Sequence, residues 1–272
     1  MPIWLFLLLA TLVSAPRADL VESTWPGQAP ARAEYRAGSP DKPAVLLLHG
    51  FLQTHEFPVI HRLTESLNSA GHTVLAPTLT LGIPLRKRSL ACEALHTHSQ
   101  ADAIAELDAW LGWLKGKGVR SVVLLGHSFG SMQSLAYAAT RPNPMVKGLI
   151  GISIIEGRLS GGRMPAKTLA DDQGFVTQPF SFCKKYRAPQ ASLASYLAWS
   201  PERVLREVGR LRVPATFIMG GKDERLGPDW IGQLQRTRAT VRIIAGADHF
   251  MDGEYEFDLL DMVLEELGDK RP

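Results

Sequence analysis

The sequence has few of the features that mark several large classes of protein. It contains 2 cysteines in 272 residues, and its formal net charge of +3 is small for that length. No long acidic or basic block, internal repeat or low-complexity tract is present. So weak a charge excludes the basic footprint of a nucleic-acid-binding domain, and we expect no nucleic acid as a partner. The densest basic run, residues 86–88, is interpreted as part of a solvated loop.

Signatures of cofactor and metal binding are also missing. The first strand–helix turn lacks the Gly-x-Gly-x-x-Gly pattern that binds dinucleotides. His96 and His98 stand two positions apart, but a zinc site needs further ligands and the sequence indicates none. We therefore expect no cofactor and no metal, and we assign the two histidines to packing or to the mouth of a binding site.

Residues 1–18 begin with a strongly apolar run. The segment from Ile3 to Val13 is followed by small residues, a pattern typical of a secretory signal peptide. The run is too short to span a bilayer as a helix, no Lys or Arg precedes it, and no nearby cysteine could carry a lipid. We predict an exported protein, periplasmic or secreted. The alternative is an uncleaved N-terminal anchor, the one case in which we expect contact with a membrane.

The rest of the chain is typical of one α/β domain. Short apolar strands alternate with helical patterns over residues 43–268, which predicts a doubly wound, mostly parallel sheet. Residues 44–48 are apolar throughout, as in a strand covered by helices on both faces. We expect residues 19–42 to be irregular. Residues 157–211 interrupt the alternation and are predicted to form a small lid insertion.

The most informative stretch lies within residues 121–130. An apolar strand pattern is followed by Gly126-His127-Ser128-Phe129-Gly130 and then by a helical pattern. A strand, a sharp turn with serine at its apex and a helix are the context of a G-x-S-x-G nucleophile elbow. The glycines are needed because the turn brings the backbone on either side of the serine into contact. We predict that Ser128 is a nucleophile held in a strained conformation.

Residues 43–267 resemble the α/β-hydrolase family at four places. These are His49-Gly50 after the first long strand, the elbow, Gly220-Gly221-Lys222-Asp223 after a late strand, and Ala247-Asp248-His249-Phe250 after the last strand. In this family the nucleophile, the acid and the histidine follow one another in that order. The resemblance implies an α/β-hydrolase fold with its active site at the carboxyl ends of the strands.

Carried over to this chain, the family's catalytic residues are Ser128, Asp223 and His249. The resemblance implies that His249 takes the serine proton and returns it to the leaving group. It implies that Asp223 orients the imidazole and stabilises its charged form. The family pattern places the oxyanion donors at the backbone N–H groups of Phe51 and Phe129.

Some residues have alternative roles. Glu156 follows an earlier strand, where some family members carry the acid, and with that assignment Asp223 would be a turn residue. We assign His127 to the lining of the elbow and not to proton transfer. His49 either orients loops around the oxyanion site or serves packing alone. Residues 78–84 lack the acidic residue and the Gly-x-Gly turn usual in the family, so the resemblance implies no particular substrate.

Substrate choice is expected to reside in the insertion. Its aromatic side chains either line an acyl pocket or form the insertion's own core, and we expect the second for most of them: Phe175, Phe180, Phe182, Tyr186, Tyr196 and Trp199. Cys92 and Cys183 lie in two segments that should meet over the carboxyl edge of the sheet. In an exported protein a disulfide between them would tie the insertion to the core, and two free thiols are the alternative.

These observations predict a serine hydrolase that forms an acyl-enzyme at Ser128. Its expected partner is a small-molecule substrate, a carboxylic ester or a related acyl compound. A serine nucleophile disfavours the alkyl-enzyme chemistry of relatives that carry aspartate at the elbow. One alternative is acyl transfer, or cleavage of an amide, thioester or C–C bond, on the same triad. A second is a non-catalytic binding protein built on the same scaffold.

Overall fold

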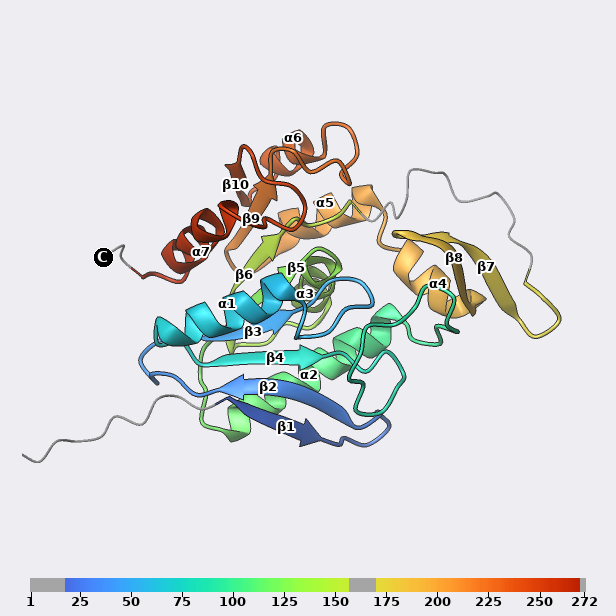
Figure 1. Cartoon of the computed structure of the whole chain (residues 1–272), viewed down its shortest axis with the longest axis horizontal. Helices are drawn as coiled ribbons and strands as arrows, with labels where there is room; N and C mark the ends of the chain where they lie inside the picture. The colour runs from blue at the N-terminus through green and yellow to red at the C-terminus, as the bar shows by residue number, and fades with distance from the viewer. Residues whose placement is uncertain (1–17, 157–169, 270–272) are drawn as a thin grey trace, which may run out of the picture.

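A sheet of eight strands lies at the centre of the molecule (Figure 1). The computed structural model describes residues 18–156 and 170–269 of the chain. The strands are β1 (Asp19–Ser23), β2 (Ala31–Arg36), β3 (Ala44–Leu48), β4 (Val74–Thr78), β5 (Val122–His127), β6 (Val146–Ile152), β9 (Ala215–Gly220) and β10 (Thr240–Ile244). Their order in the sheet is β1-β2-β4-β3-β5-β6-β9-β10. Only β2 runs antiparallel to its neighbours; the other neighbouring pairs are parallel. A separate antiparallel pair consists of β7 (Phe175–Phe180) and β8 (Cys183–Pro189).

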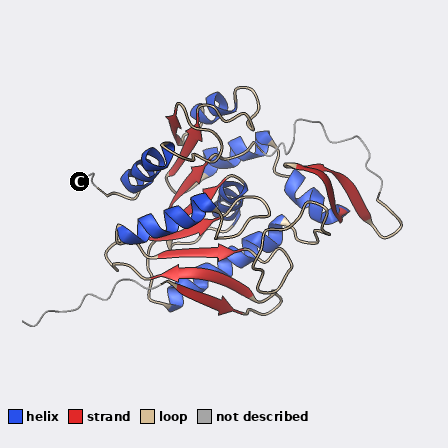
Figure 2. Ribbon diagram, viewed as in Figure 1, coloured by secondary structure: helices blue, strands red, loops and turns tan. Residues whose placement is uncertain are grey.

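Helices cover both faces of this sheet (Figure 2). One face carries α1 (Pro58–Ser69) and α7 (Tyr255–Glu266). The other carries α2 (Gln100–Gly116), α3 (Phe129–Thr140), α5 (Pro201–Arg210) and α6 (Trp230–Gln235), while α4 (Gln190–Leu197) belongs to the insertion. Each layer of helices shares one apolar cluster with the sheet. The predicted doubly wound, mostly parallel α/β sheet with a small insertion is confirmed.

β3 shows why a strand inside this sheet is apolar along its whole length. All of its residues are buried. Leu46 and Leu48 contribute to the cluster under α2 and α3, whereas Val45 and Leu47 contribute to the cluster under α1 and α7. Successive side chains of a strand point to opposite faces, so two layers of helices require apolar residues at every position. Burying each such leucine stabilises the fold by about 1.5–3 kcal/mol, which makes the central strands a firm base for the loops that follow them.

Residues 19–42 correct the sequence prediction, because they are not irregular. β1 and β2 pair with each other, and β2 continues the sheet beside β4. The two alanines of β2 are fully buried, and so nearly are Arg32 and Glu34 on the same strand. These strands escaped prediction because they are short and rich in charged residues, which gives them the composition of a loop. The folded domain begins at β1 and not near residue 43.

The predicted signal peptide or anchor, residues 1–18, falls outside the described residues except for Ala18. No helix within residues 18–156 and 170–269 combines the length and the apolar character needed to cross a bilayer. Export of the protein therefore stays a prediction.

The predicted lid insertion, residues 157–211, is shorter than the sequence indicated. Its first part, residues 157–169, lies outside the described part of the chain. β7, β8 and α4 form a small unit to the right of the main sheet in Figure 1. α5 packs directly against α3, with Val204 and Val208 buried. It is the helix of the crossover that joins the parallel strands β6 and β9, so the insertion ends before it.

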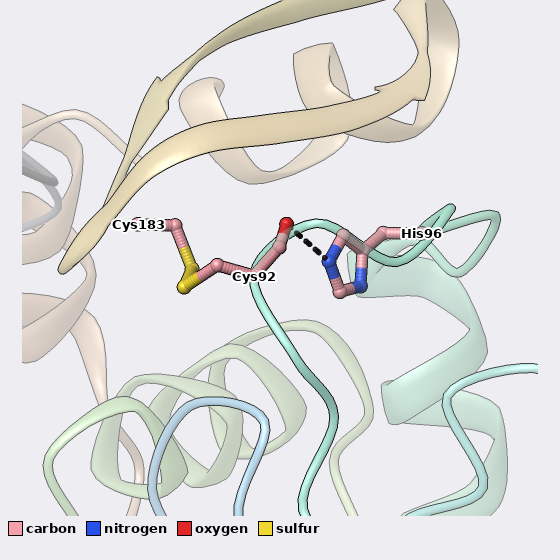
Figure 3. Close-up of a disulfide and its surroundings, with 3 residues drawn as sticks. All are labelled: Cys92, His96 and Cys183. Carbon is pink, nitrogen blue, oxygen red and sulfur yellow. Dashed lines mark hydrogen bonds between the residues drawn. A yellow bond between two sulfur atoms is a disulfide. The ribbon is translucent and has the colours of Figure 1, made fainter.

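A disulfide joins the insertion to the loop that precedes α2 (Figure 3). Cys92 and Cys183 are bonded, with 5.2 Å between their Cα atoms and a separation of 91 residues in the sequence. The same two segments form a parallel bridge between Leu95 and Arg187, and the N–H of His96 donates to the Arg187 oxygen over 2.9 Å. Figure 3 shows the His96 ring beside Cys92, with its Nε2 atom 3.3 Å from the Cys92 carbonyl oxygen. Of the two alternatives left open by the sequence, the disulfide is confirmed.

Candidate active site

Ser128 lies on a sharp turn between β5 and α3. Its backbone has φ of 55° and ψ of −118°, a strained combination for a residue with a side chain. A Cβ on Gly126 would lie 2.4 Å from the carbonyl carbon of Gly130, and a Cβ on Gly130 would lie 2.5 Å from the backbone oxygen of Leu48. The hydroxyl of Ser131 donates to the Gly126 oxygen over 2.7 Å and braces the turn. Both glycine positions therefore require glycine, as the sequence predicts.

Three side chains from separate segments meet above this turn. Asp223 follows β9 and His249 follows β10, so both lie at the carboxyl edge of the sheet with Ser128. The Nε2 atom of His249 is 2.8 Å from the Ser128 oxygen, and its Nδ1 atom is 2.7 Å from Oδ2 of Asp223. The serine hydroxyl donates to Nε2, and the Nδ1–H group donates to the carboxylate. The Asp223 side chain is fully buried and that of His249 is 6% exposed. Such an arrangement allows an imidazole to remove the serine proton.

His127 holds the backbone of the loop after β10, which carries His249. Its Nε2–H group donates to the carbonyl oxygen of His249 over 2.9 Å, and its ring stacks on Phe57. Burial lowers the pKa of His127 to about 3, with the neighbouring His249 ring as the next largest cause. The ring is therefore neutral at physiological pH, and it lines the elbow as assigned from the sequence. A Cβ on Gly220 would lie 2.3 Å from the oxygen of Asp248, so the loops after β9 and β10 also approach closely.

Glu156, the alternative acid, follows β6 and packs against a different segment. Its carboxylate is packed against Gly227, where an added Cβ would lie 2.3 Å from Oε2 of Glu156. The single proton on Nδ1 of His249 is already donated to Asp223. The geometry therefore favours Asp223 as the partner of the imidazole.

The residues predicted to supply oxyanion donors lie side by side. Phe129 is the first residue of α3. An N–H group in the first turn of a helix has no partner within that helix and lies at the positive end of the helix dipole. Phe51 follows His49-Gly50 directly after β3. The rings of Phe51 and Phe129 are 5.1 Å apart, and Gly130 packs against the oxygen of His49. Both backbone segments therefore border the serine.

Aromatic side chains of the insertion cover this site. The ring of Phe51 contacts four others, with centroid distances of 5.1–5.7 Å: Phe129, Phe180, Phe182 and Tyr186. Most aromatic residues of the insertion are buried, whereas Phe182 is 54% exposed. The predicted packing role is confirmed for most of them, but the core they form is shared with Phe51 and Phe129 and is not the insertion's own.

His96 and His98 pack between the insertion and the main domain. The His96 ring stacks on Tyr186 at a centroid distance of 4.2 Å, and Nδ1 of His98 is 2.5 Å from the hydroxyl oxygen of Tyr196. Burial is the main cause that lowers the pKa of both rings, that of His98 to about 3. Over the described ranges, no group of three or more His, Cys, Asp or Glu residues is gathered in a way that could hold a metal ion.

Two charged residues beside the site were not identified from the sequence. Arg86, predicted to lie in a solvated loop, is buried, and this corrects that prediction. It donates to the carbonyl oxygens of Gln53 and Leu79. Glu106 on α2 is also buried and accepts hydrogen bonds from Thr80. No sequence signal was available, because a basic loop and an acidic residue on a helix have the same composition as a solvated surface.

Known structures share this architecture. Alpha/beta hydrolase domain-containing protein 10 from mouse matches with a TM-score of 0.70 at 18% sequence identity, over 93% of this chain and 99% of that chain. Est1E from Butyrivibrio proteoclasticus matches with a TM-score of 0.65 at 17% identity, over 92% of this chain and 99% of that chain. The monoacylglycerol lipase of Paleococcus ferrophilus matches with a TM-score of 0.61 at 22% identity, over 87% and 98%. At such identities these likenesses show the fold alone.

The family is shown by the sequence itself. No curated protein sequence matches the chain. Residues 45–256, however, match the model of the Alpha/beta hydrolase family, a span that runs from β3 into α7 and includes every residue of the site described above. The chain therefore belongs to the α/β-hydrolase family.

Proposed function

We propose that this protein is a serine hydrolase that forms an acyl-enzyme at Ser128 and cleaves carboxylic esters. The observation that carries the proposal is the continuous line of hydrogen bonds from the Ser128 hydroxyl through His249 to Asp223, with distances of 2.8 and 2.7 Å. A serine hydroxyl is a weak nucleophile at neutral pH, and an adjacent oriented imidazole is what activates it.

Acylation begins when the Ser128 oxygen attacks the ester carbonyl carbon and its proton passes to Nε2 of His249. The buried carboxylate of Asp223 stabilises the imidazolium that forms. The negative oxygen of the tetrahedral intermediate accepts hydrogen bonds from the N–H groups of Phe51 and Phe129, each donor contributing about 2.7–4 kcal/mol. The carbon–oxygen bond to the leaving group then breaks, and the alcohol departs with the proton from His249.

Deacylation repeats these steps with water. His249 takes a proton from a water molecule, whose oxygen attacks the acyl carbon. The second tetrahedral intermediate uses the same two donors. When it collapses, Ser128 leaves as the hydroxyl with the proton returned by His249, and the carboxylic acid is released.

The surroundings of the serine support an apolar acyl group. Phe51, Phe129 and Phe180 form a connected group of rings beside the elbow. Est1E, one of the proteins with the same fold, has been solved with ferulic acid bound, and other matches are lipolytic enzymes. A thioester is the second candidate substrate, because a thioesterase domain from the curacin biosynthetic pathway also matches over 92% of this chain.

The test is labelling with a fluorophosphonate, which reacts with activated serines, followed by hydrolysis of p-nitrophenyl esters of increasing acyl length. We expect wild type to be labelled and Ser128→Ala to be neither labelled nor active. Ser134→Ala, which removes a buried hydroxyl from α3, is the matched control and should behave as wild type. Absence of labelling in folded wild-type protein would favour a non-catalytic binding protein.

We also propose that the protein is exported. The disulfide between Cys92 and Cys183 supports this, because such bonds persist in oxidising compartments. Mass spectrometry of the protein from fractionated cells tests the proposal. A soluble periplasmic or secreted chain that lacks the apolar N-terminal run supports export, whereas the full-length chain in the membrane fraction supports an uncleaved anchor.

A further inference from the structure

The loop after β3 that carries Phe51, residues 49–53, is called the Phe51 loop and is braced by its own side chains. The Nδ1 atom of His49 is 2.8 Å from the carbonyl oxygen of Gly50, and the Gly50 N–H donates to Oε1 of Gln53 over 3.1 Å. In a planar trans peptide the C=O and N–H groups point in opposite directions. Fixing the Gly50 carbonyl therefore also fixes the direction of the Phe51 N–H, one of the two proposed oxyanion donors.

His49 can hold that carbonyl in one tautomer only. The N–H of Leu79, in the segment after β4, donates to Nε2 of His49 over 3.0 Å. Nε2 is therefore unprotonated, and the proton lies on Nδ1, facing the Gly50 oxygen. Burial, with the nearby Arg86 guanidinium as the next largest cause, lowers the pKa of His49 to about 3, so the ring is neutral at physiological pH.

Arg86 binds both the Phe51 loop and the segment after β4. Arg86 is 3% exposed. The guanidinium donates to the carbonyl oxygen of Gln53 over 2.6 Å, of Leu79 over 2.8 Å and of Leu52 over 3.4 Å. It also lies 3.3 Å from Nε2 of His49. A planar guanidinium serves several acceptors in fixed directions, which the single ammonium of lysine does not.

Glu106 holds the same segment from the opposite side. Its Oε2 atom accepts hydrogen bonds from the Thr80 N–H over 3.0 Å and from the Thr80 hydroxyl over 2.9 Å. Burial raises the pKa of Glu106 to about 7, and these hydrogen bonds and the Arg86 charge act in the other direction. The segment that presents Leu79 to His49 is thus held from two sides, by the buried guanidinium of Arg86 and by the buried carboxyl group of Glu106.

We propose that Arg86 is a positioning residue of the oxyanion hole, whose guanidinium holds the carbonyl groups of the Phe51 loop and, through Leu79 and His49, keeps the Phe51 N–H directed at Ser128. This inference rests on the proposed function. Arg86 touches no substrate and acts through the backbone. Without it, the carbonyl oxygens of Leu79 and Gln53 lose the donors that Arg86 supplies, and the peptide between Gly50 and Phe51 is free to turn.

The test compares Arg86→Met, which keeps the bulk of the stem, with Arg86→Lys, which keeps the charge and a single donor group. Arg32→Met is the control for loss of a buried arginine, because Arg32 is also buried but lies on β2, opposite Thr78 of β4, and not against the Phe51 loop. For each variant we would measure kcat and KM for a p-nitrophenyl ester, and the inhibition constant of a trifluoromethyl ketone. That inhibitor adds to the serine and places a negative oxygen in the hole.

We expect Arg86→Met to lower kcat about 100-fold, as loss of one oxyanion donor does, with KM within about threefold of wild type. The ketone should bind more weakly by a similar factor. Arg86→Lys should recover less than a tenth of the lost kcat. Arg32→Met is expected to lower the midpoint of thermal unfolding while kcat stays within about threefold of wild type.

The inference is overturned if folded Arg86→Met keeps kcat and ketone binding near those of wild type, or if Arg32→Met loses as much kcat. Should Arg86→Met not fold, Arg86→Lys decides, and wild-type kcat in that variant would refute a need for the planar fork. Failure of the proposed function is seen separately, since wild type itself would then resist fluorophosphonate and leave esters intact.

Discussion

The nucleophile elbow and the Phe51 loop lie against each other, yet they are held in shape by different means. The elbow requires residues without a Cβ atom at Gly126 and Gly130, because a Cβ at either position would collide with the backbone. The Phe51 loop depends on added atoms, because Arg86 reaches its carbonyl groups from a segment 34 residues further along the chain. One arrangement is encoded in neighbouring residues, and the other appears only when the chain has folded.

The difference suggests how each region should respond to change. At a position that has no room for a Cβ, adding one methyl group is expected to destabilise the fold at once. In a loop held by several hydrogen bonds from one side chain, activity is expected to fall in steps, according to how many donors remain. Substitutions in the two regions can therefore separate a steric requirement from an electrostatic one.

The largest effect is expected for Phe51→Pro. Proline removes the backbone N–H, so kcat should fall about 100- to 1000-fold, equivalent to about 2.7–4 kcal/mol of barrier. Phe51→Leu keeps the N–H and should lower kcat less than about tenfold. Steady-state kinetics on an ester substrate measure both. Equal losses in the two variants would show that the ring, and not the backbone donor, matters at this position.

A second substitution tests the steric side of the comparison. Gly126→Ala places a methyl group 2.4 Å from the backbone of Gly130, and we expect it to lower the free energy of unfolding by about 3 kcal/mol. Gly112→Ala in α2 is the control, since an added Cβ there meets no atom within 4 Å. The control should stabilise the protein by about 0.5–1 kcal/mol. Urea unfolding measures both values, and wild-type stability in Gly126→Ala would refute the steric account of the elbow.

The smallest effect concerns the charge of Glu106. Because its folded pKa of about 7 lies above the ordinary value of 4.5, the folded protein binds a proton more tightly than the unfolded chain. Its contribution is therefore most favourable below about pH 4.5 and is lost as the pH rises to about 7, by on the order of 2–3 kcal/mol.

Urea unfolding of wild type and Glu106→Gln between pH 5 and pH 8 measures this contribution. We expect the difference in unfolding free energy between the two proteins to shift against wild type as the pH rises and to become constant above about pH 8. A difference that does not change with pH would mean that Glu106 has the same pKa in the folded and unfolded chain.

What the sequence predicts well is what neighbouring residues determine. The elbow is a case, because its glycines, its serine and the strand and helix around it are consecutive. The central strands are another, since burial on both faces leaves an uninterrupted apolar run such as that of β3. Ser128, Asp223 and His249 were assigned from the resemblance of four motifs to the α/β-hydrolase family, and the fold brings these three side chains within hydrogen-bonding distance.

What the sequence missed depends on burial of charge. β1 and β2 have the composition of a loop, but β2 pairs with the edge of β4, β1 pairs with β2, and α2 helps to cover them. Arg86 and Glu106 look solvated until Leu79, Gln53 and Thr80 are placed around them. A charged residue is buried only where partners distant in the sequence satisfy its hydrogen bonds. Composition does not show which partners the fold will bring to it.

The most direct test of the central claim is to locate the adduct that a fluorophosphonate leaves on the protein. Trypsin should release residues 121–147 as one peptide, which contains Ser128 and three other serines. Tandem mass spectrometry of that peptide should place one phosphonyl group on Ser128, and the adduct should be absent from His249→Ala. An adduct on another serine, or labelling that persists without the imidazole, would contradict the proposed mechanism.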